Sequence, residues 1–224
     1  MEFSFTTKEE EFRREVQKFI AQNWVEPLMT LNSENDAAWD ARRDYERKLA
    51  ENGWLTMAWP KEYGGGGASH IKQLIFREES AYAGAPGASG QGISMVGPCL
   101  MVHGSEEQRK RFLPPIANAE VTWAQGFSEP GAGSDLASVQ CRAVRDGDDY
   151  IINGQKIWTS DAHRSEWIHV LTRTEPKAPK HRGISYFLLD MRTPGIDVRP
   201  IIDMSGRHYL NETFFSVSVF LQIR

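Results

Sequence analysis

The stretch VTWAQGFSEPGAGSD, residues 121–135, divides the chain into two parts of different character. Its first seven residues form a short, largely apolar run of the kind found in β-strands. The remaining residues include two glycines and one proline, which do not hold regular structure, so they predict a loop. We therefore expect a sheet to begin near residue 121 and a separate unit to precede it.

The part before residue 121 has helical signals. Thr6 with Glu9 and Thr7 with Glu10 both have the spacing of a capping box, and the residues that follow place apolar side chains at helical spacing. Glycines at 64–67 predict a loop over 59–69. Ser105 and Gln108 form a second capping-box pattern. The pattern predicts helices at 36–52 and 70–82, an apolar and buried helix within 89–104, and a short helix that starts after Ser105 and ends at Pro114–Pro115.

The part after residue 120 consists of short strands separated by turns. Expected strands lie at 121–127, 138–145, 149–154, 155–160, 166–174, 184–190 and 195–201. Asp146–Gly147 and Asn153–Gly154 are dipeptides typical of hairpin turns. The sequence thus predicts an α+β protein, with a helical N-terminal domain over 1–120 and an antiparallel β-barrel domain over 121–224.

Composition excludes several classes of protein. The net charge of −4 offers no basic surface for nucleic acid. The two cysteines form no CxxC motif, and the six histidines have no metal-binding spacing, so we predict no disulfide and no metal site. No apolar run reaches the ~20 residues of a membrane span, and the charged N-terminus lacks a signal-peptide core, so we expect a cytoplasmic protein.

The glycine-rich loop is the first candidate binding site. Gly131 and Gly133 would let another molecule approach the backbone, whose N–H groups can donate to carbonyl, imide or phosphate oxygens. Ser128 and Ser134 add hydroxyl groups. The loop is neither a Walker A motif nor a Rossmann motif, and its composition alone favours an ordinary connection between strands.

The second candidate is the sequence WTS at 158–160. The indole of Trp158 can pack on a flat conjugated ring, while the hydroxyls of Thr159 and Ser160 can bond the edge of that ring. A tryptophan in a strand is more often a core residue, so the pattern alone leaves both readings open.

Longer segments resemble the acyl-CoA dehydrogenase family. The most distinctive are WAQGFSEPGAGSDLASVQCRA (123–143) and DYIINGQKIWTSDAHRSEWIHVLTRT (149–174). Shorter matching segments are GWLTMAWPKEYGG (53–65), HGSEEQRKRFLPPIANAE (103–120), RGISYFLLD (182–190) and NETFF (211–215). They occur in the family's order and extend from near the N-terminus to about residue 215, so the resemblance covers nearly the whole chain.

The resemblance implies a fold, a cofactor and a reaction. Family members have a helical N-terminal domain, a middle β-barrel domain and a C-terminal four-helix bundle. They bind FAD and oxidise an acyl-CoA thioester to the trans-2-enoyl-CoA. The implied FAD contacts are Gln125, Phe127, Ser128, Gly133, Ser134, Trp158, Thr159 and Ser160. Ser134 would also contact the substrate, Trp158 would pack on the flavin, and backbone near Phe127 would bond its pyrimidine edge.

The resemblance also implies partners and shows departures. It implies an acyl-CoA substrate, an electron-transfer flavoprotein as electron acceptor, and a homo- or hetero-oligomer. Gln125 stands where many members have an aromatic residue, and Phe127 is bulkier than the usual small aliphatic residue. We expect both differences to alter the shape of the substrate site.

The family pattern is lost in the last residues. SVSVFLQIR (216–224) lacks the acidic pair and the proline with which relatives continue, so we expect a truncated or frame-shifted product or a short natural variant. The family's general base is a glutamate of the C-terminal bundle. We therefore predict no catalytic residue within 1–224, weak FAD binding and little activity of the isolated chain. Glu129 and Glu166 are poor substitutes, because a general base needs the correct position first.

Three alternatives remain open. The chain could be a non-catalytic subunit that binds flavin or acyl groups and completes the active site of a partner. It could be a remnant without a stable fold. It could also belong to an acyl-CoA oxidase, which shares the first half-reaction and differs in its access to oxygen.

Overall fold

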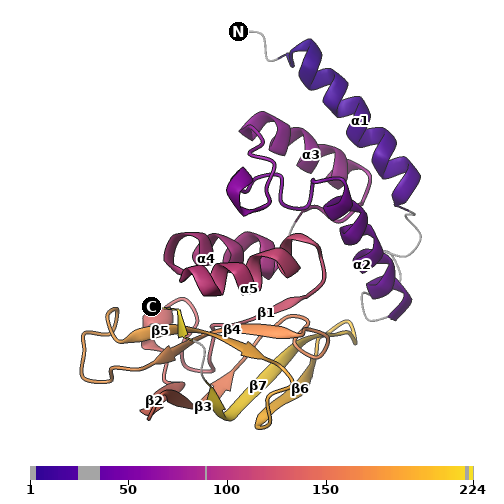
Figure 1. Cartoon of the computed structure of the whole chain (residues 1–224). Coiled ribbons are helices and arrows are strands. Elements are labelled where there is room, and N and C mark those ends of the chain that lie inside the picture. The colour runs from indigo at the N-terminus through magenta and orange to yellow at the C-terminus, as the bar shows by residue number, and fades with distance from the viewer. Residues whose placement is uncertain (1–3, 25–35, 89, 220–221, 224) are drawn as a thin grey trace. The chain divides into compact units, whose positions relative to one another are not determined.

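The computed structural model describes residues 4–24, 36–88, 90–219 and 222–223 (Figure 1). Contacts divide the chain into two compact units. One comprises Met1–Pro98 and Lys110–Glu120, and the other comprises Cys99–Arg109 and Val121–Arg224. The first unit is helical and the second contains the sheet, which confirms the predicted α+β order.

The helical unit begins with the elements that the sequence predicts. They are α1 (Thr7–Asn23), α2 (Asp36–Glu51), the 3-10 helix η2 (Lys61–Tyr63) and α3 (His70–Tyr82). The predicted capping box is present, because Thr6 accepts a bond from the Glu9 amide and the Glu9 carboxylate accepts one from the Thr6 amide. Trp54 packs edge-on against Phe12 and Phe76, with ring centroids 5.7 and 5.9 Å away. The largest part of this core is Phe12, Val16, Ile20, Tyr45, Leu49, Trp54, Ile75 and Phe76.

The region 92–117 differs from its prediction in two ways. The expected buried helix is a π-helical turn, η3 (Gly92–Val96), followed by α4 (Gly97–His103), and Val102 is 73% exposed. Helix α5 (Glu106–Ala117) starts at the predicted capping box but continues through Pro114–Pro115, so the predicted end was wrong. The carbonyls of these prolines still accept bonds from Asn118 and Glu120, since proline removes only its own donor.

The second unit contains one mixed, eight-stranded sheet. Its strands are β1 (Trp123–Gly126), β2 (Arg142–Asp146), β3 (Asp149–Lys156), β4 (Trp167–Arg173), β5 (Ile184–Asp190), β6 (Ile196–Ile202), β7 (His208–Val219) and β8 (Gln222–Ile223). Their order is β6-β7-β3-β2-β4-β5-β8, and β1 pairs with β4. Most pairs are antiparallel as predicted, whereas β1 and β2 both run parallel to β4. The β2–β3 hairpin lies between β1 and β4 in sequence and supplies the crossover that a parallel pair needs.

Only one of the two predicted hairpin turns is a turn. Asp146–Gly147 connects β2 and β3, and Gly147 has the expected positive φ of 62°. Asn153–Gly154 lies inside β3, which continues to Lys156, so that prediction was wrong. A Cβ atom on Gly154 would lie 2.7 Å from the Cα of Cys141, so this glycine permits close packing of two backbones.

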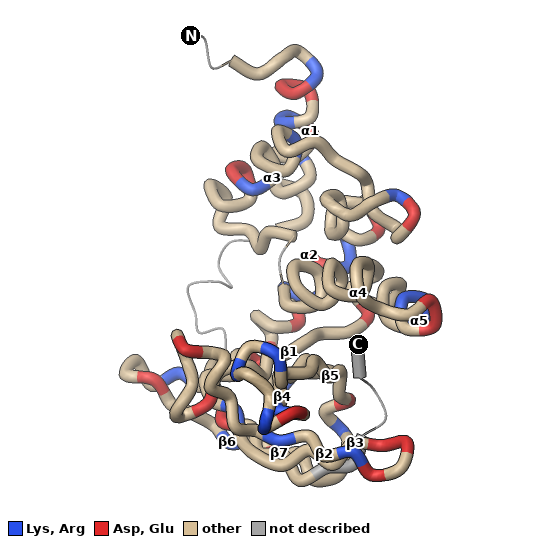
Figure 2. The backbone as a smooth tube through the Cα atoms, turned by 90° about the vertical axis from the view of Figure 1, so that its left-hand side faces the viewer, with Lys and Arg blue, Asp and Glu red and all other residues tan. Residues whose placement is uncertain are grey.

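Charged residues of both signs are distributed over the helices and over the loops of the sheet (Figure 2), in agreement with the small net charge of −4. Across the described residues, no helix combines the length and hydropathy needed to cross a bilayer. The same residues contain no cluster of three or more His, Cys, Asp or Glu side chains that could hold a metal ion.

Candidate functional site

The loop after β1 is a tight turn with open space around its glycines. Glu129 and Ala132 exchange two backbone hydrogen bonds of 2.8 and 3.0 Å, which closes the turn. A Cβ atom on Gly131 or Gly133 would have no neighbour within 4 Å among the described residues. These glycines therefore leave their backbone accessible to another molecule, as the sequence predicts.

A buried ion pair anchors this loop to the sheet. The Lys156 ammonium is fully buried, and it donates to the Glu129 carboxylate at 2.7 Å and to the carbonyl of Phe127 at 3.1 Å. Glu129 also accepts from the backbone amides of Gln140 at 2.7 Å and Cys141 at 2.9 Å. One carboxylate thus connects β3, the loop and the segment before β2. Sequence reasoning did not assign Lys156 to the site, because a lysine at the end of a strand with several polar residues (DYIINGQK) gives no local sign that it is buried.

Burial controls the ionisation of the groups around this pair. Removal from water lowers the pKa of Lys156, while the hydrogen bond that it donates to Glu129 opposes that effect. Burial raises the pKa of the Cys141 thiol to about 11, so this cysteine remains a neutral core residue. Hydrogen-bond donors occupy both carboxylate oxygens of Glu129, so this residue anchors the loop to the sheet.

Glu166, the other carboxylate considered as a base, caps the start of β1. One of its oxygens accepts from both the amide and the hydroxyl of Thr122, each at 2.6 Å. The residue is exposed and lies immediately before β4.

Phe127 lies against two polar residues that sequence reasoning missed. Its ring meets His169 edge-on at 5.1 Å and Tyr186 at 6.3 Å, and the Tyr186 hydroxyl is 2.9 Å from Nδ1 of His169. Gln125 is half-buried on β1, beside His169 in the β1–β4 register. Burial lowers the pKa of His169 to about 3, which keeps the imidazole neutral. His169 and Tyr186 lie within the apolar strands β4 and β5. Only the pairing of the strands in the folded sheet brings them next to Phe127.

The segment after β3 leaves the strand through a local bulge at Trp158. Trp158 has a positive φ of 61°, and 57% of the residue is exposed. Thr159 is fully buried, and its hydroxyl has no hydrogen-bond partner among the described residues. Ser160 is half-buried. Because a bulge turns a side chain out of the sheet, the indole is presented at the surface rather than in the core.

The two candidate segments lie side by side. The amide of Ile157, next to Trp158, donates to the carbonyl of Ser128 at 2.9 Å. Gly133 and Ser134 are exposed and lie farther along the same loop. The tertiary structure therefore joins Phe127 and Ser128 to the start of the Trp158 bulge, with Gly133 and Ser134 extending from that junction.

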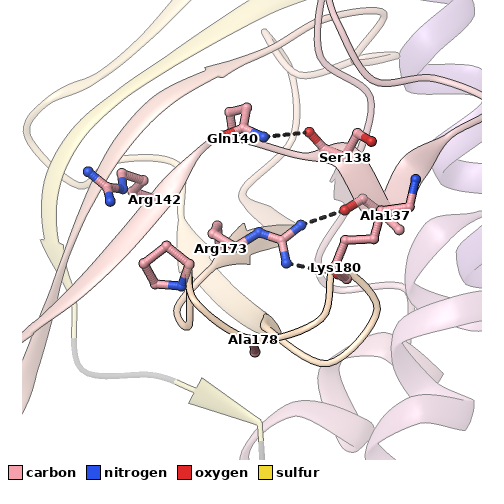
Figure 3. Close-up of a pocket in the computed structure, with 8 residues that line it drawn as sticks. Ala137, Ser138, Gln140, Arg142, Arg173, Ala178 and Lys180 are labelled. Carbon is pink, nitrogen blue, oxygen red and sulfur yellow. Dashed lines mark hydrogen bonds between the residues drawn. The ribbon is translucent and has the colours of Figure 1, made fainter.

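A basic pocket of about 430 Å³ lies at the far end of the loop (Figure 3). Arg173 occupies its centre and donates to the carbonyls of Ala137, Val139 and Lys180. The Lys180 ammonium pairs with Asp135 at 2.8 Å, which lowers the pKa of Asp135 and connects the glycine-rich loop to the pocket. Its lining residues are Ala137, Ser138, Gln140, Arg142, Arg173, Pro176, Ala178 and Lys180.

Comparisons with known proteins agree with this architecture. The sequence profile of the acyl-CoA dehydrogenase N-terminal domain matches residues 6–120, and that of the acyl-CoA dehydrogenase middle domain matches residues 124–217. The chain is 42% identical to the acyl-CoA dehydrogenase IpdE1 of Mycobacterium tuberculosis over 212 residues, which cover 92% of this chain and 55% of that protein.

Solved structures show the same fold. A chain of the ChsE4–ChsE5 complex from Mycobacterium tuberculosis has a TM-score of 0.84 at 41% identity, with 98% of this chain and 56% of that chain covered. A chain of the Tcur3481–Tcur3483 steroid ACAD has a TM-score of 0.87 at 37% identity, with 98% and 57% covered. This chain thus spans about half the length of the curated relatives it matches. The two matched profiles, the sequence identity and the shared fold together place the chain in the acyl-CoA dehydrogenase family.

Proposed function

We propose that this chain forms the FAD- and acyl-CoA-binding part of an enzyme that oxidises an acyl-CoA thioester to the trans-2-enoyl-CoA. The junction of the 127–135 loop with the Trp158 bulge, fixed by the bond between Ile157 and Ser128, carries this proposal. It combines an exposed indole, accessible glycine backbone and hydroxyl groups in the segments that follow β1 and β3. Such a surface suits a flat, polar-edged ring better than a globular ligand.

The described residues fit the flavin of FAD in three respects. Trp158 offers an exposed indole on which a ring can pack. The Thr159 hydroxyl is buried and lacks a partner among the described residues, although buried hydroxyls are normally bonded. Gly131 and Gly133 leave space in which a Cβ atom would meet nothing. We propose that the cofactor is held by Gln125, Phe127, Ser128, Gly133, Ser134, Trp158, Thr159 and Ser160.

FAD, when bound, supplies the acceptor for the hydride that leaves the β-carbon of the substrate. The chain's own contribution is to bind and orient. Backbone donors near Phe127 and Ser128 stabilise negative charge at the ring edge, and the apolar wall of Phe127 excludes water from the reacting atoms. Glu129 and Glu166 are engaged as anchor and cap, so we propose no general base among the described residues.

The basic pocket suits the phosphate groups of coenzyme A. Arg142 is exposed, and Arg173 and Lys180 add positive charge to the same cavity. Phosphate is recognised by arginine and lysine through charge-assisted hydrogen bonds. Since Asp135 links this pocket to the glycine-rich loop, one acyl-CoA molecule could engage both, with Ser134 near the thioester.

Removal of the exposed indole tests the flavin site. FAD titrated into the chain should bind saturably but weakly, and Trp158→Ala should weaken binding about tenfold, since lost aromatic packing of about 1.5 kcal/mol corresponds to that factor. Flavin fluorescence would measure the affinity. Tyr82→Ala, at a residue 95% exposed in the helical unit, is the control and should bind FAD as the original chain does. Equal affinity of the Trp158 variant and the control would contradict the proposed site.

Charge reversal tests the coenzyme A pocket. Arg142→Glu should weaken binding of coenzyme A about tenfold, because an attractive charge becomes a repulsive one near the phosphates. Calorimetric titration should also show a smaller effect for dephospho-coenzyme A, which carries less negative charge. The matched control is Arg145→Glu, on the same strand outside the pocket lining. Identical losses for both variants would indicate a general charge effect and not a site.

A non-catalytic subunit is the second candidate function. Two of the similar solved structures are named as assemblies of two proteins, the ChsE4–ChsE5 complex and the Tcur3481–Tcur3483 steroid ACAD. We propose that this chain also works in a homo- or hetero-oligomer, with an electron-transfer flavoprotein as electron acceptor. Dehydrogenase activity that appears only after addition of a full-length homologue would favour this candidate. Turnover by the chain alone would exclude it.

A further inference from the structure

The side chain of Asn211 holds the backbone of Thr159 from β7. Its Nδ2 donates to the Thr159 carbonyl at 2.9 Å, and its own backbone carbonyl accepts from the Thr159 amide at 2.9 Å. Asn211 is fully buried. Both backbone polar groups of Thr159 are thus satisfied by one residue, directly between Trp158 and Ser160.

This contact lies at a β-bulge, where the segment after β3 has one more residue than the stretch of β7 that faces it. Lys156 lies opposite Thr213, and the Asp161 amide bonds to the Tyr209 carbonyl. Between these two pairings the chain advances five residues from Lys156 to Asp161, but only four residues separate Tyr209 from Thr213. The extra residue makes a bulge, and Trp158 and Asp161 adopt positive φ values of 61° and 54°. A left-handed conformation is unfavourable for residues other than glycine, so it persists only where neighbouring contacts impose it.

Two stacked imidazoles fix the orientation of the Asn211 amide. The rings of His163 and His208 are 4.0 Å apart with an interplanar angle of 24°. His208 Nε2 is 2.7 Å from Oδ1 of Asn211, and His163 Nδ1 is 3.2 Å from its Nδ2. Because Nδ2 must face the Thr159 carbonyl, Oδ1 accepts from His208 and Nδ1 of His163 faces Nδ2 as an acceptor. Nε2 of His163 lies 3.2 Å from Nε of Arg164, a second donor for the same ring. A neutral imidazole has one acceptor nitrogen, so it accepts from Asn211 or from Arg164 at any one time, and either bond requires the neutral ring.

This arrangement needs His163 to be neutral. Desolvation lowers the pKa of His163, and the neighbouring His208 and Arg164 lower it further. Unfolded histidine protonates near pH 6.5, above the lowered folded pKa. The contribution of this bond is therefore present near neutral pH and is lost as the pH falls below 6.5.

We propose that Asn211, oriented by the His163–His208 stack, is a positioning residue that sets the Trp158–Ser160 bulge for the cofactor. The inference rests on the proposed function, since it assigns the bulge to flavin binding. The network acts through Thr159 and does not itself need to touch the ligand. None of its three side chains belongs to the predicted site. Asn211 and His208 lie on β7, about fifty residues beyond the bulge, and their contact with it forms only in the folded sheet. His163 follows Ser160 by three residues, but its partner Asn211 is equally distant in sequence.

The bulge can be observed directly without any cofactor. The chain would be labelled with 5-fluorotryptophan, and the Trp158 resonance among the seven tryptophans would be assigned with Trp158→Phe. Asn211→Ala should shift or broaden only that resonance. His163→Lys carries a permanent charge that cannot accept a bond, so at pH 7.5 it should produce the same change. His163→Gln retains an acceptor and should preserve the original signal.

The pH profile separates positioning from a merely structural role. The original chain should show a Trp158 transition below pH 6.5, and His163→Gln should abolish it because glutamine does not titrate. His103→Gln, on α4, is the control and should retain the transition. A persistent transition in His163→Gln, or an unchanged Trp158 signal in both Asn211→Ala and His163→Lys, would overturn the proposal.

FAD titrations distinguish an effect on the conformation of the Trp158 bulge from an effect on cofactor binding. Asn211→Ala and His163→Lys should bind FAD about tenfold more weakly, the loss expected when one hydrogen bond that holds the site is removed. If these variants change the Trp158 signal but bind FAD normally, the network does not position the cofactor site and the inference fails. If the original chain shows no saturable FAD binding, the proposed function fails, while the fluorine spectra still decide whether Asn211 sets the bulge.

Discussion

Glu129→Ala should destabilise the sheet-containing unit by about 3–5 kcal/mol, the usual consequence of removing one member of a buried ion pair. The substitution would leave the Lys156 ammonium, which is fully buried, without its carboxylate partner. It would also remove the acceptor of two backbone amides, those of Gln140 and Cys141. The 127–135 loop should lose its fixed position, so FAD affinity should fall together with stability.

Denaturant unfolding, followed by circular dichroism and by flavin fluorescence, would measure both effects. The double variant Glu129→Leu/Lys156→Met should be less destabilised than Glu129→Ala, because it leaves no unpaired buried charge. Asp197→Ala, which breaks the exposed pair of Asp197 with Arg199, is the control and should have little effect on stability. Equal stabilities of Glu129→Ala and Asp197→Ala would contradict the anchoring role.

Arg173→Met should have the second largest effect, lowering the free energy of unfolding by about 3 kcal/mol, because several carbonyl groups would be left without a donor. Arg173 is 7% exposed, and its guanidinium joins two segments, the one before β2 through the carbonyls of Ala137 and Val139 and the 175–183 loop through the carbonyl of Lys180. Figure 3 shows the bonds to Ala137 and Lys180. Without it, the 175–183 loop and the segment before β2 have no common donor. The pocket should lose its shape, and coenzyme A should bind more weakly.

Arg173→Lys and Arg145→Met make this prediction specific. Lysine keeps the charge but lacks the planar fork, so Arg173→Lys should restore little of the lost stability. Arg145 is an exposed arginine on β2 that donates to one carbonyl, that of Gly147, and its replacement should be nearly neutral. Hydrogen exchange of residues 175–183 should accelerate in the Arg173 variants and not in the Arg145 variant. Full rescue by lysine would show that charge, and not the fork, organises the pocket.

Local patterns were sufficient where a few adjacent residues define the structure. The capping boxes at Thr6 and Ser105 locate the starts of α1 and α5 because their bonds join residues three apart. Gly53, with a φ of 70°, follows α2 as predicted. The β2–β3 turn follows equally from Asp146–Gly147. The juxtaposition of the two candidate site segments, by contrast, required the sheet to form.

Tertiary structure decided the features that depend on partners distant in sequence. Gly154 permits close packing against Cys141 and does not form a turn. The residues adjacent to it in sequence do not distinguish these two roles. The prolines of α5 do not end the helix at once, because their own carbonyls still accept bonds from the amides of Asn118 and Glu120 beyond them.

The sequence by itself determined the order of the two units, the helix starts and the segments that resemble a flavin site, because these depend on neighbouring residues or on a continuous motif. The folded sheet alone decided how Lys156 holds Glu129 and how Asn211 holds the Trp158 bulge. Those contacts join strands separated by tens of residues, and their strength comes from burial that exists only once the strands are paired.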